Sequence, residues 1–297
     1  MVDYRDALDE LRKFDFSTED SDYIYQRLIN LGRIGVIVTS LSRGKKIIRA
    51  RLSEEASFTT ISKLSFKPSQ HNITYQRAST PRNTMFYGSI VPEVLGNTEP
   101  TTARIPIIFE LSEFVRNDDT IGEQDITFSA WEVQDTIELI SLVHHKRFVR
   151  PTELTRQLQE QFEHFVGEDQ NLRNQSLAIS EYLAYEFAKS EIPHHLHYMI
   201  SAIFSEIICQ RFDGVLYPSV RLAGEGINVA IKPQTVNDKL RFLGASECTV
   251  YKNKDKVFVG NNTQSSHDIH GNLTFHRVER ENFVTKEMGR RLVGLNS

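Results

Sequence analysis

The sequence contains few of the residues and motifs on which common folds and active sites are built. Its two cysteines, Cys209 and Cys248, lie far apart and outside any Cys-x-x-Cys pair. We therefore expect a reducing compartment, with neither a disulfide framework nor a zinc ribbon. No apolar run approaches the roughly 20 residues of a membrane span, and the charged start Met1–Asp6 lacks the apolar core of a signal peptide. These absences predict a soluble, cytoplasmic protein.

Motifs for phosphate binding, serine hydrolysis and metal binding are also missing. The chain has no Gly-x4-Gly-Lys-Ser/Thr loop and no Gly-x-Ser-x-Gly elbow, and Gly224-x-Gly226 lacks the third glycine of a dinucleotide fingerprint. The histidines at 144–145 and 194–197 have no carboxylate at a useful spacing. We expect no metal, and we interpret these histidines as solvent-facing or capping residues.

Composition permits a packed core and limits the classes of partner. Of the 297 residues, 39% are hydrophobic and 25% charged, which is enough for one large domain or two small ones. The net charge of −4 and the pI near 6.2 argue against a broad nucleic-acid or anionic-membrane surface, although they leave room for a local basic pocket.

Residue patterns predict an α+β protein. Helices are expected within 3–31 and 151–211, with the apolar segment 197–211 buried. Strands are expected at 47–52, 104–111, 125–133, 137–143, 215–217 and 227–231, and a hairpin over 247–260. We interpret 261–272 as a polar loop and 288–297 as a loose end. The predicted organisation is a helical lead-in (1–44), a main domain (45–233) and a hairpin-containing extension packed on it (234–297).

Several polar residues allow both a functional and a structural interpretation. Arg49 and Arg51 share one face of a predicted strand, which suits a phosphate clamp or a solvated surface. Glu110 follows the apolar run Ile105–Phe109, where a carboxylate faces either a cleft or water. Ser219 follows Tyr217-Pro218 as either a hydrogen-bond donor in a pocket or a turn serine, and spacing alone favours the turn.

The stretch Tyr75–Gly88 combines a polar turn with a short apolar strand. Ser79-Thr80-Pro81 is typical of a turn of fixed geometry, and Met85–Ser89 of a buried strand. Arg77 suits a phosphate or carboxylate ligand, and Tyr87 offers a stacking face with a polar tip. Taken alone, this stretch favours a structural interpretation, in which Arg77 binds backbone carbonyls and Tyr87 packs in the core.

The order of these residues resembles the RES domain family, which is named for its Arg, Glu and Ser. The resemblance rests on Ile48-Arg49, the turn and strand from Arg77 to Tyr87, a later glutamate, and Asp213-Gly214-Val215-x-Tyr217-Pro218-Ser219, followed by Asn228-Val229-Ala230. It spans 45–233 in four separated segments, of which 213–219 is the most specific. The family's Gly-Arg-Trp/Phe-Asn turn is Gln76-Arg77-Ala78-Ser79 here, and the long distance from Tyr87 to Glu110 makes Glu93 a rival glutamate.

The resemblance implies an ADP-ribosyltransferase-like fold, with small β-sheets packed around an NAD cleft and helices outside. It implies an enzyme that breaks the nicotinamide–ribose bond of NAD with water or phosphate as acceptor. Many proteins of this family are toxins held in check by an Xre-type antitoxin, so we expect an antitoxin, a protein acceptor or a second copy of the chain as possible partners. This chain is longer than the compact members.

The resemblance also assigns roles to residues. Loss of cationic nicotinamide develops positive charge on the ribose, which a carboxylate, here Glu110, would stabilise. Arg49 and Arg77, and with less support Arg51, would hold the pyrophosphate. Tyr87 would stack on the nicotinamide ring, Ser219 would donate a hydrogen bond in the same pocket, and Asn228 would orient it.

Two alternatives stay open at this stage. The chain could transfer ADP-ribose to a protein, since the acceptor depends on access to the pocket. It could also be a binding module that keeps an NAD-type fold without catalysis. Convergence of Arg49, Arg77, Tyr87 and Glu110 on one cleft would favour an enzyme, and scattered side chains would favour the binding module.

Overall fold

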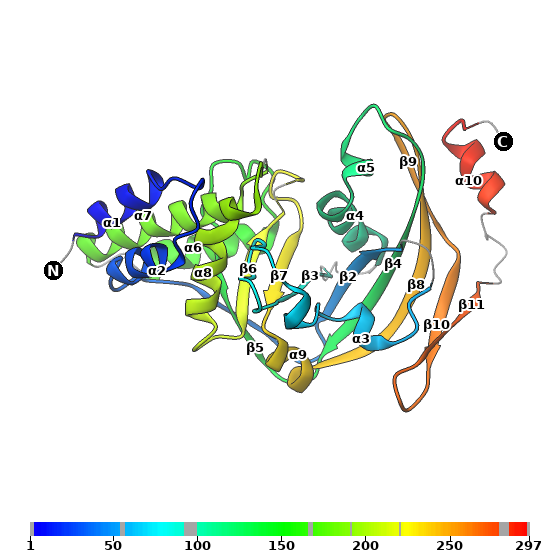
Figure 1. Cartoon of the computed structure of the whole chain (residues 1–297), viewed down its shortest axis with the longest axis horizontal. Helices are drawn as coiled ribbons and strands as arrows, with labels where there is room; N and C mark the ends of the chain where they lie inside the picture. Colours follow the sequence, from blue (N-terminus) through cyan, green and yellow to red (C-terminus); the bar gives the residue numbers. More distant parts are fainter. Residues whose placement is uncertain are drawn as a thin grey trace. The chain divides into compact units, whose positions relative to one another are not determined.

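A computed structural model describes residues 3–53, 57–91, 100–165, 169–190, 192–219, 221–278 and 285–295, with Arg104 as the only described side chain within 100–106. The chain combines helices and strands, which confirms the predicted α+β class. It forms two compact units, each built from three separate stretches (Figure 1). Unit 1 contains 1–42, 67–87 and 136–239, and unit 2 contains 43–66, 88–135 and 240–297. The predicted division at residues 44 and 233 stays a prediction.

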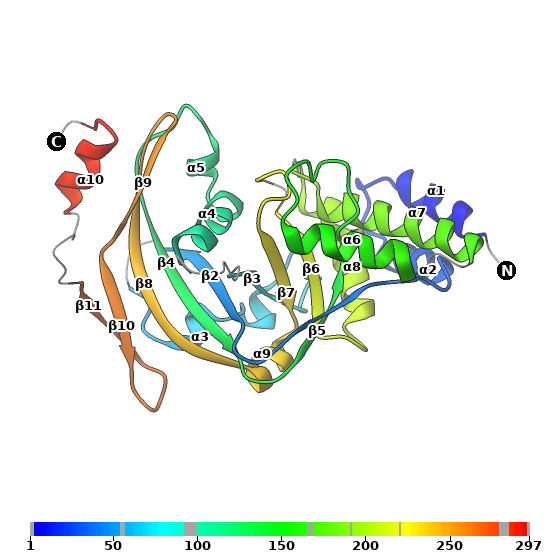
Figure 2. The ribbon, with the colours of Figure 1, turned by 180° about the vertical axis from the view of Figure 1, so that it is seen from behind.

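Unit 1 packs helices against four paired strands. The strands are β1 (Val38–Leu41), β5 (Ile137–Ser141), β6 (Gly214–Pro218) and β7 (Ile227–Ile231), in the order β1-β5-β6-β7. Only the β5–β6 pair is parallel. The longer helices are α1 (Tyr4–Arg12), α2 (Ser21–Asn30), α6 (Glu153–Phe165), α7 (Gln170–Phe187) and α8 (Met199–Ile208). Figures 1 and 2 show these helices gathered on one side of β5, β6 and β7. Shorter helices are η1 (Ser69–His71), η2 (His195–Tyr198) and α9 (Pro233–Lys239).

The core of unit 1 follows the apolar patterns of the sequence. Helix α2 begins after Asp20, whose carboxylate accepts from the Tyr23 N–H and caps the first turn. Helix α8 is buried from Met199 to Ser205, as its apolar sequence predicts. Strands β6 and β7 are buried at every position, which is typical of strands covered on both faces. A β-carbon at Gly214 would lie 2.0 Å from the Ala230 carbonyl oxygen, so close strand approach requires glycine in the Asp-Gly pair.

Unit 2 is built on a curved antiparallel sheet. Its strands are β3 (Phe86–Ile90, which enters this unit at Gly88), β2 (Lys46–Leu52), β4 (Ile121–Val133), β8 (Leu240–Asn253) and β9 (Lys256–Asn261), in the order β3-β2-β4-β8-β9. Helices α4 (Pro100–Leu111) and α5 (Glu113–Arg116) lie on one side of β4 and β8 (Figures 1 and 2). The ribbon of β10 (Thr263–His267) and β11 (Leu273–Arg277) and helix α10 (Lys286–Leu292) lie on the other. The short helix α3 (Ile61–Leu64) contacts β2.

Three predictions of local structure are wrong, all in unit 2. Residues 104–111 belong to helix α4, because an apolar run of this length does not distinguish a strand from a buried helix. The predicted polar loop 261–272 contains strand β10, which pairs with β11. The predicted loose end contains helix α10, which the Thr285 side chain caps and the Arg290–Glu123 contacts of 3.0 and 3.2 Å attach to β4. In these three segments, contacts with distant parts of the chain determine the secondary structure.

We expect Gly289→Ala to weaken the packing of α10 on the sheet. A β-carbon at this position would lie 2.4 to 2.8 Å from three atoms of the buried Tyr251 ring, so the helix would have to move outward. The expected cost is about 1–3 kcal/mol, as for other overpacked contacts. Hydrogen exchange should become faster across 285–295, while the exposed neighbouring variant Met288→Ala should leave it unchanged. Unchanged exchange in both variants would contradict this packing.

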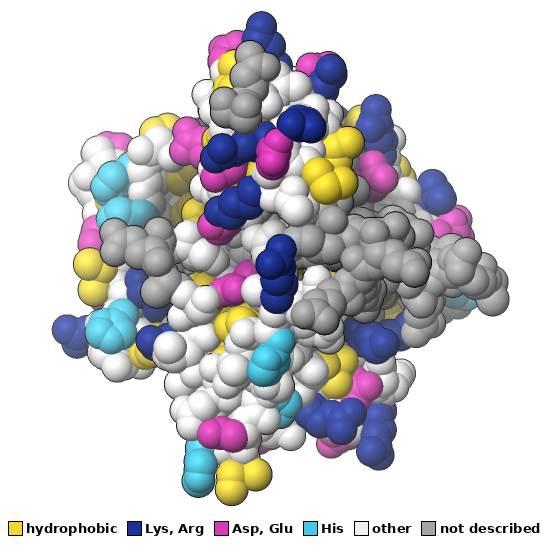
Figure 3. Space-filling model, turned by 90° about the vertical axis from the view of Figure 1, so that its right-hand side faces the viewer, with side chains coloured by type: hydrophobic (Ala, Val, Ile, Leu, Met, Phe, Trp, Pro, Cys, Tyr) yellow, Lys and Arg dark blue, Asp and Glu magenta, His cyan; other side chains and the backbone are white. Residues whose placement is uncertain are grey.

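One face of the molecule shows how its surface charge is distributed. In the view of Figure 3, Lys and Arg side chains lie interspersed with Asp and Glu side chains and form no continuous basic surface. This mixture agrees with the net charge of −4.

Candidate functional site

Arg77 stabilises the end of helix α7. Its guanidinium donates to the Phe187 carbonyl and, over 3.1 Å, to the Lys189 carbonyl, and it lies over the Tyr198 ring at 5.4 Å. The last carbonyls of a helix have no partner within the helix, and a guanidinium supplies the missing donors. The structural interpretation of Arg77, in which it binds backbone carbonyls, is therefore confirmed.

The Tyr87 hydroxyl closes the turn that precedes its own strand. It accepts from the Ala78 N–H at 2.9 Å and bonds the Ser79 hydroxyl at 2.8 Å. The Ser79 hydroxyl also accepts from the Met85 N–H at 3.0 Å, and Ser79 is fully buried. The half-buried Tyr87 ring packs against the core of unit 1. The turn and the strand thus form one locked structure.

Arg82 is an exposed arginine of this turn, to which the sequence alone assigned no role. Its φ of 64° is left-handed, a conformation that costs energy for a side chain other than glycine. The buried Asn72 holds this conformation: its carbonyl accepts from the Arg82 N–H at 2.7 Å, and its amide donates to the Thr80 carbonyl at 2.7 Å. The sequence signal was the arginine immediately after Thr80-Pro81, a pair typical of turns.

Ser219 and Asn228 lie in the hairpin formed by β6 and β7. Ser219 is fully buried, and its N–H donates to the Gly226 carbonyl at 2.9 Å. Asn228 is 6% exposed and pairs with Tyr217 across the hairpin. The Tyr217 ring lies 5.3 Å from the ring of Phe187, the residue whose carbonyl Arg77 binds. Unit 1 therefore brings two of the four resembling segments, the Arg77–Tyr87 segment and the segment that begins at Asp213, into one core.

Arg49, Arg51 and Glu110 belong to unit 2. Ile48 and Ala50 of β2 pack in one cluster with Ile107 and Ile108 of α4, the helix that carries Glu110. Arg49 and Arg51 alternate with Ile48 and Ala50, so they lie on the opposite face of β2. Within this unit, the strand therefore separates the arginine face from α4. The rival glutamate, Glu93, lies outside the described residues.

Arg51 has a structural role like that of Arg77. Its guanidinium donates to the Lys63 carbonyl at 2.5 Å, at the end of α3, and lies 5.3 Å from the centre of the Phe58 ring. This contact stabilises the last turn of a short helix.

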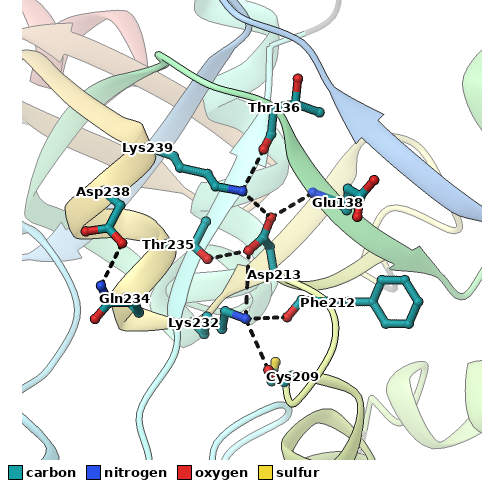
Figure 4. A network of polar contacts seen from close by, with 10 residues as sticks. All are labelled: Thr136, Glu138, Cys209, Phe212, Asp213, Lys232, Gln234, Thr235, Asp238 and Lys239. Carbon is teal, nitrogen blue, oxygen red and sulfur yellow. Dashed lines mark hydrogen bonds and ion pairs between the residues drawn. The ribbon is translucent and has the colours of Figure 1, made fainter.

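Asp213 is the centre of a polar network in unit 1 (Figure 4). Its carboxylate accepts from the Thr235 hydroxyl at 2.6 Å, the Glu138 N–H at 3.0 Å and the Lys239 ammonium at 2.9 Å, and Lys232 lies 3.8 Å away. Burial raises the pKa of Asp213, but these hydrogen bonds and the Lys239 charge outweigh burial and hold the pKa below its usual value. The network joins β5, β6 and α9. It gives Asp213 of the Asp213-Gly214 pair a structural role in holding these elements together.

A cavity of about 910 Å³ in unit 1 contains polar groups that the sequence did not single out. Its walls come from the end of α1 and the loop after it, from 144–146, from α6 and α7, and from η2. Aromatic rings line it: Phe14 and Phe16 on the N-terminal segment and Tyr182 and Tyr185 on α7. Sequence reasoning missed it because residues from 11 to 197 meet only in the folded chain.

A buried ion pair lies against this cavity. The Glu186 side chain is 3% exposed and the Lys189 side chain 14%, and they form a salt bridge. The Lys189 ammonium lies 4.8 Å from the centre of the Phe16 ring and 5.7 Å from that of Tyr185, within the range of cation–π contacts. Burial raises the pKa of Glu186, although the nearby Lys189 opposes this shift. Perturbed titratable groups in an aromatic cavity are typical of binding sites.

The histidines were interpreted as solvent-facing or capping residues, but His144 and His197 pack their rings in the cavity. His144 bonds the Ser180 hydroxyl at 3.2 Å and packs on Phe162, and His197 stacks on Phe16 with ring centres 4.7 Å apart. Burial lowers the pKa of His144, His145 and His197, so these rings favour the neutral form. His194 does cap η2, because its ring accepts from the Leu196 N–H at 3.5 Å.

We expect unit 1 to lose stability as pH falls from 7.5 to 5. A histidine in the unfolded chain takes up a proton near pH 6.5, whereas folded His144 resists protonation until a lower pH, so acid favours the unfolded state. The melting temperature of His144→Gln should fall less over this range than that of the wild type. The exposed His71→Gln variant should behave like the wild type. Parallel curves for His144→Gln and the wild type would contradict this account.

The described residues contain neither a candidate metal site nor a candidate membrane span. Across those residues, no three His, Cys, Asp or Glu side chains group as metal ligands would. No described helix combines the length and apolarity needed to cross a membrane. In comparisons with known proteins, no family matches the chain and no similar curated sequence is found.

Proposed function

We propose that the chain is an NAD-consuming enzyme that cleaves the nicotinamide–ribose bond, with an ADP-ribosyltransferase-like arrangement around its site. The proposal rests first on the ordered resemblance to the RES family. The observation that carries it further is the core of unit 1. Segments that are about 130 residues apart in sequence, 75–87 and 213–230, pack together with Tyr87, Tyr217 and Ala230 in one cluster. If the resemblance had arisen by chance, there would be no reason for the two matching segments to pack together.

The geometry of unit 1 refines the proposed roles. Tyr87 keeps the role of stacking on nicotinamide, because its hydroxyl is fixed by the turn and the orientation of the ring is therefore fixed. Ser219 and Asn228 stay proposed as polar groups of the same hairpin. Arg77 becomes a positioning residue, since its guanidinium binds the α7 end. Arg82 replaces it as the proposed phosphate contact, because Asn72 holds it in a rigid, exposed turn.

The roles of Arg49 and Glu110 rest on the resemblance alone, because β2 separates its arginine face from α4, the helix that carries Glu110. Arg49 is proposed to bind phosphate, and Glu110, or its rival Glu93, to stabilise the positive charge on the ribose. Arg51 is a weaker proposal than Arg49, because it already binds the Lys63 carbonyl. A toxin role, with an Xre-type antitoxin as partner, is part of the same proposal. No metal is required by the proposed chemistry.

The acceptor distinguishes the forms that this proposal can take. The purified chain should be incubated with NAD, labelled in its ADP-ribose part, with and without phosphate. Phosphate-dependent nicotinamide release would identify a phosphorylase, and phosphate-independent release a glycohydrolase. Label that appears on a protein would identify a transferase. Binding of NAD without release, in a chain whose fold is confirmed by circular dichroism, would favour the non-catalytic module.

Arg82→Ala tests the refined phosphate contact. The variant should raise the KM for NAD about tenfold, because one charge-assisted contact to phosphate is lost. The Asn72→Ala variant removes the support of the turn and should act in the same direction. The exposed Arg5→Ala variant on α1 is the control and should leave KM unchanged. If Arg82→Ala also leaves KM unchanged, the assignment of Arg82 is wrong.

A further inference from the structure

The 910 Å³ cavity of unit 1 has a lining different from the unit 1 residues of the proposed NAD chemistry. None of Arg77, Tyr87, Ser219 and Asn228 lines it. Its volume lies within the range of small-molecule sites, which is about 300–1,000 Å³. Its lining combines aromatic rings with polar and charged groups, a pattern typical of a ligand site. The volume and the lining of the cavity therefore indicate a separate ligand-binding site.

The aromatic walls favour a flat ring. Phe16 stacks on His197, and Tyr185 lies 5.8 Å from His145, so rings border the cavity on the side of the N-terminal segment and on the side of α7. Tyr185 keeps 44% of its surface exposed, which leaves ring surface available for stacking. Rings with such exposed faces stack readily on nucleobases.

The charges favour an anion on that ring. The carboxylate of Glu186 is 3% exposed and already paired with Lys189, so it is poorly placed to accept a cationic ligand. Arg12 and Lys146 bring two further positive charges to the lining, which also includes the carboxylate of Glu181. Arg12 additionally bonds the exposed Asp9 carboxylate at 3.1 Å, so a phosphate would share this guanidinium with Asp9. The Arg12 guanidinium lies over the Tyr182 ring at 5.7 Å, beside the aromatic wall. Arginine and lysine together are typical of phosphate recognition.

We infer that this cavity binds a nucleoside monophosphate, with the base against the aromatic walls and the phosphate near Arg12 and Lys146. The neutral ring nitrogens of His145 and His197 suit hydrogen bonds to the polar edges of a base. Lys189 also links the cavity to α7, because its carbonyl accepts from Arg77 at 3.1 Å. The inference stands on the cavity alone and does not depend on the proposed NAD chemistry.

Calorimetric titration of the full chain with three probes tests this inference. Adenosine 5′-monophosphate should bind, and adenosine and ribose 5-phosphate, which each lack one half of the ligand, should bind at least about tenfold more weakly. Tyr185→Leu and Arg12→Gln should each weaken binding of the monophosphate about tenfold. The matched controls Tyr25→Leu and Arg5→Gln, which alter exposed residues outside the cavity, should leave binding unchanged.

A further variant separates this cavity from the proposed NAD site. Arg49→Ala removes a proposed phosphate contact in unit 2 and should leave the affinity for the monophosphate unchanged. Loss of binding in Arg49→Ala with full binding in Tyr185→Leu would overturn the inference, because the ligand would then occupy the NAD site. Absence of binding in the wild type, or equal affinity for all three probes, would also overturn it.

Discussion

The Arg49→Ala variant is expected to lose nicotinamide release from NAD by about a hundredfold or more, while the fold stays intact. In the proposed enzyme, Arg49 holds a phosphate while positive charge develops on the ribose, and loss of one preorganised donor typically costs 10²–10³-fold in rate. The half-buried position of Arg49 within β2 fixes its direction. Nicotinamide release followed by chromatography measures the effect, and circular dichroism checks the fold.

Two variants separate a specific role of Arg49 from a general effect of positive charge. Arg49→Lys keeps the charge but not the planar fork, and it should recover only a small part of the activity. Arg51→Ala removes the neighbouring charge on the same strand face, and it should affect mainly stability, because Arg51 binds the Lys63 carbonyl. Equal loss in both alanine variants would show that Arg49 has no special role.

The Asp213→Ala variant should show the largest loss of stability in unit 1. It leaves the Lys239 ammonium, whose side chain is 28% exposed, without its carboxylate, and it removes the acceptor of the Thr235 hydroxyl and the Glu138 N–H. Breaking a largely buried charged pair in this way costs about 3 kcal/mol or more. Urea unfolding should show a much lower midpoint with an unchanged slope.

The pH dependence gives an independent check on Asp213. Because its folded pKa is held below the usual value, its stabilisation is complete above that value and is lost as the pH falls through the folded pKa. The difference between the wild type and Asp213→Asn should therefore shrink in acid. Asp238→Ala, which removes a hydrogen bond of 2.6 Å on the exposed side of α9, should change stability little at any pH. A difference between wild type and Asp213→Asn that persists in acid would contradict this account.

Local signals in the sequence were sufficient for the elements whose patterns are regular. Helix α2 lies within the predicted helical range 3–31, helix α8 lies within the apolar segment 197–211, and the β8–β9 pair forms the hairpin predicted over 247–260. The strand from Ile47 to Leu52 was also predicted correctly. In these elements, the spacing of the apolar residues or the turn residues at the ends fit one type of secondary structure only.

The remaining features depend on contacts between distant parts of the chain. Helix α4 was predicted as a strand, because Ile107 and Ile108 reveal their partners on β2 only after folding. Strand β10 and helix α10 were missed for the same reason, since pairing with β11 and packing against Tyr251 position them. The Glu186–Lys189 pair and the cavity around it had no motif, because no local spacing joins residues 12, 145 and 186.

Some of the predicted site residues have structural contacts that the sequence could not reveal, and others lie close together as the resemblance requires. Arg77 and Arg51 were assigned to phosphate, but their guanidiniums bind carbonyls at the ends of α7 and α3. The sequence could identify the arginines, but it could not show which backbone groups lie within their reach. Tyr87, Ser219 and Asn228 belong to segments that unit 1 packs together, and this proximity is the main structural support for the proposal.

Nicotinamide release from NAD by the wild-type chain, compared with the Tyr87→Leu variant, tests the central proposal most directly. We predict time-dependent release by the wild type and at least about tenfold less by the variant, because a fixed stacking surface for the leaving group is lost. The control Tyr25→Leu should keep full activity. A folded wild type that releases no nicotinamide, with phosphate or a cell extract as source of acceptor, would contradict the proposal and leave the chain as a binding module.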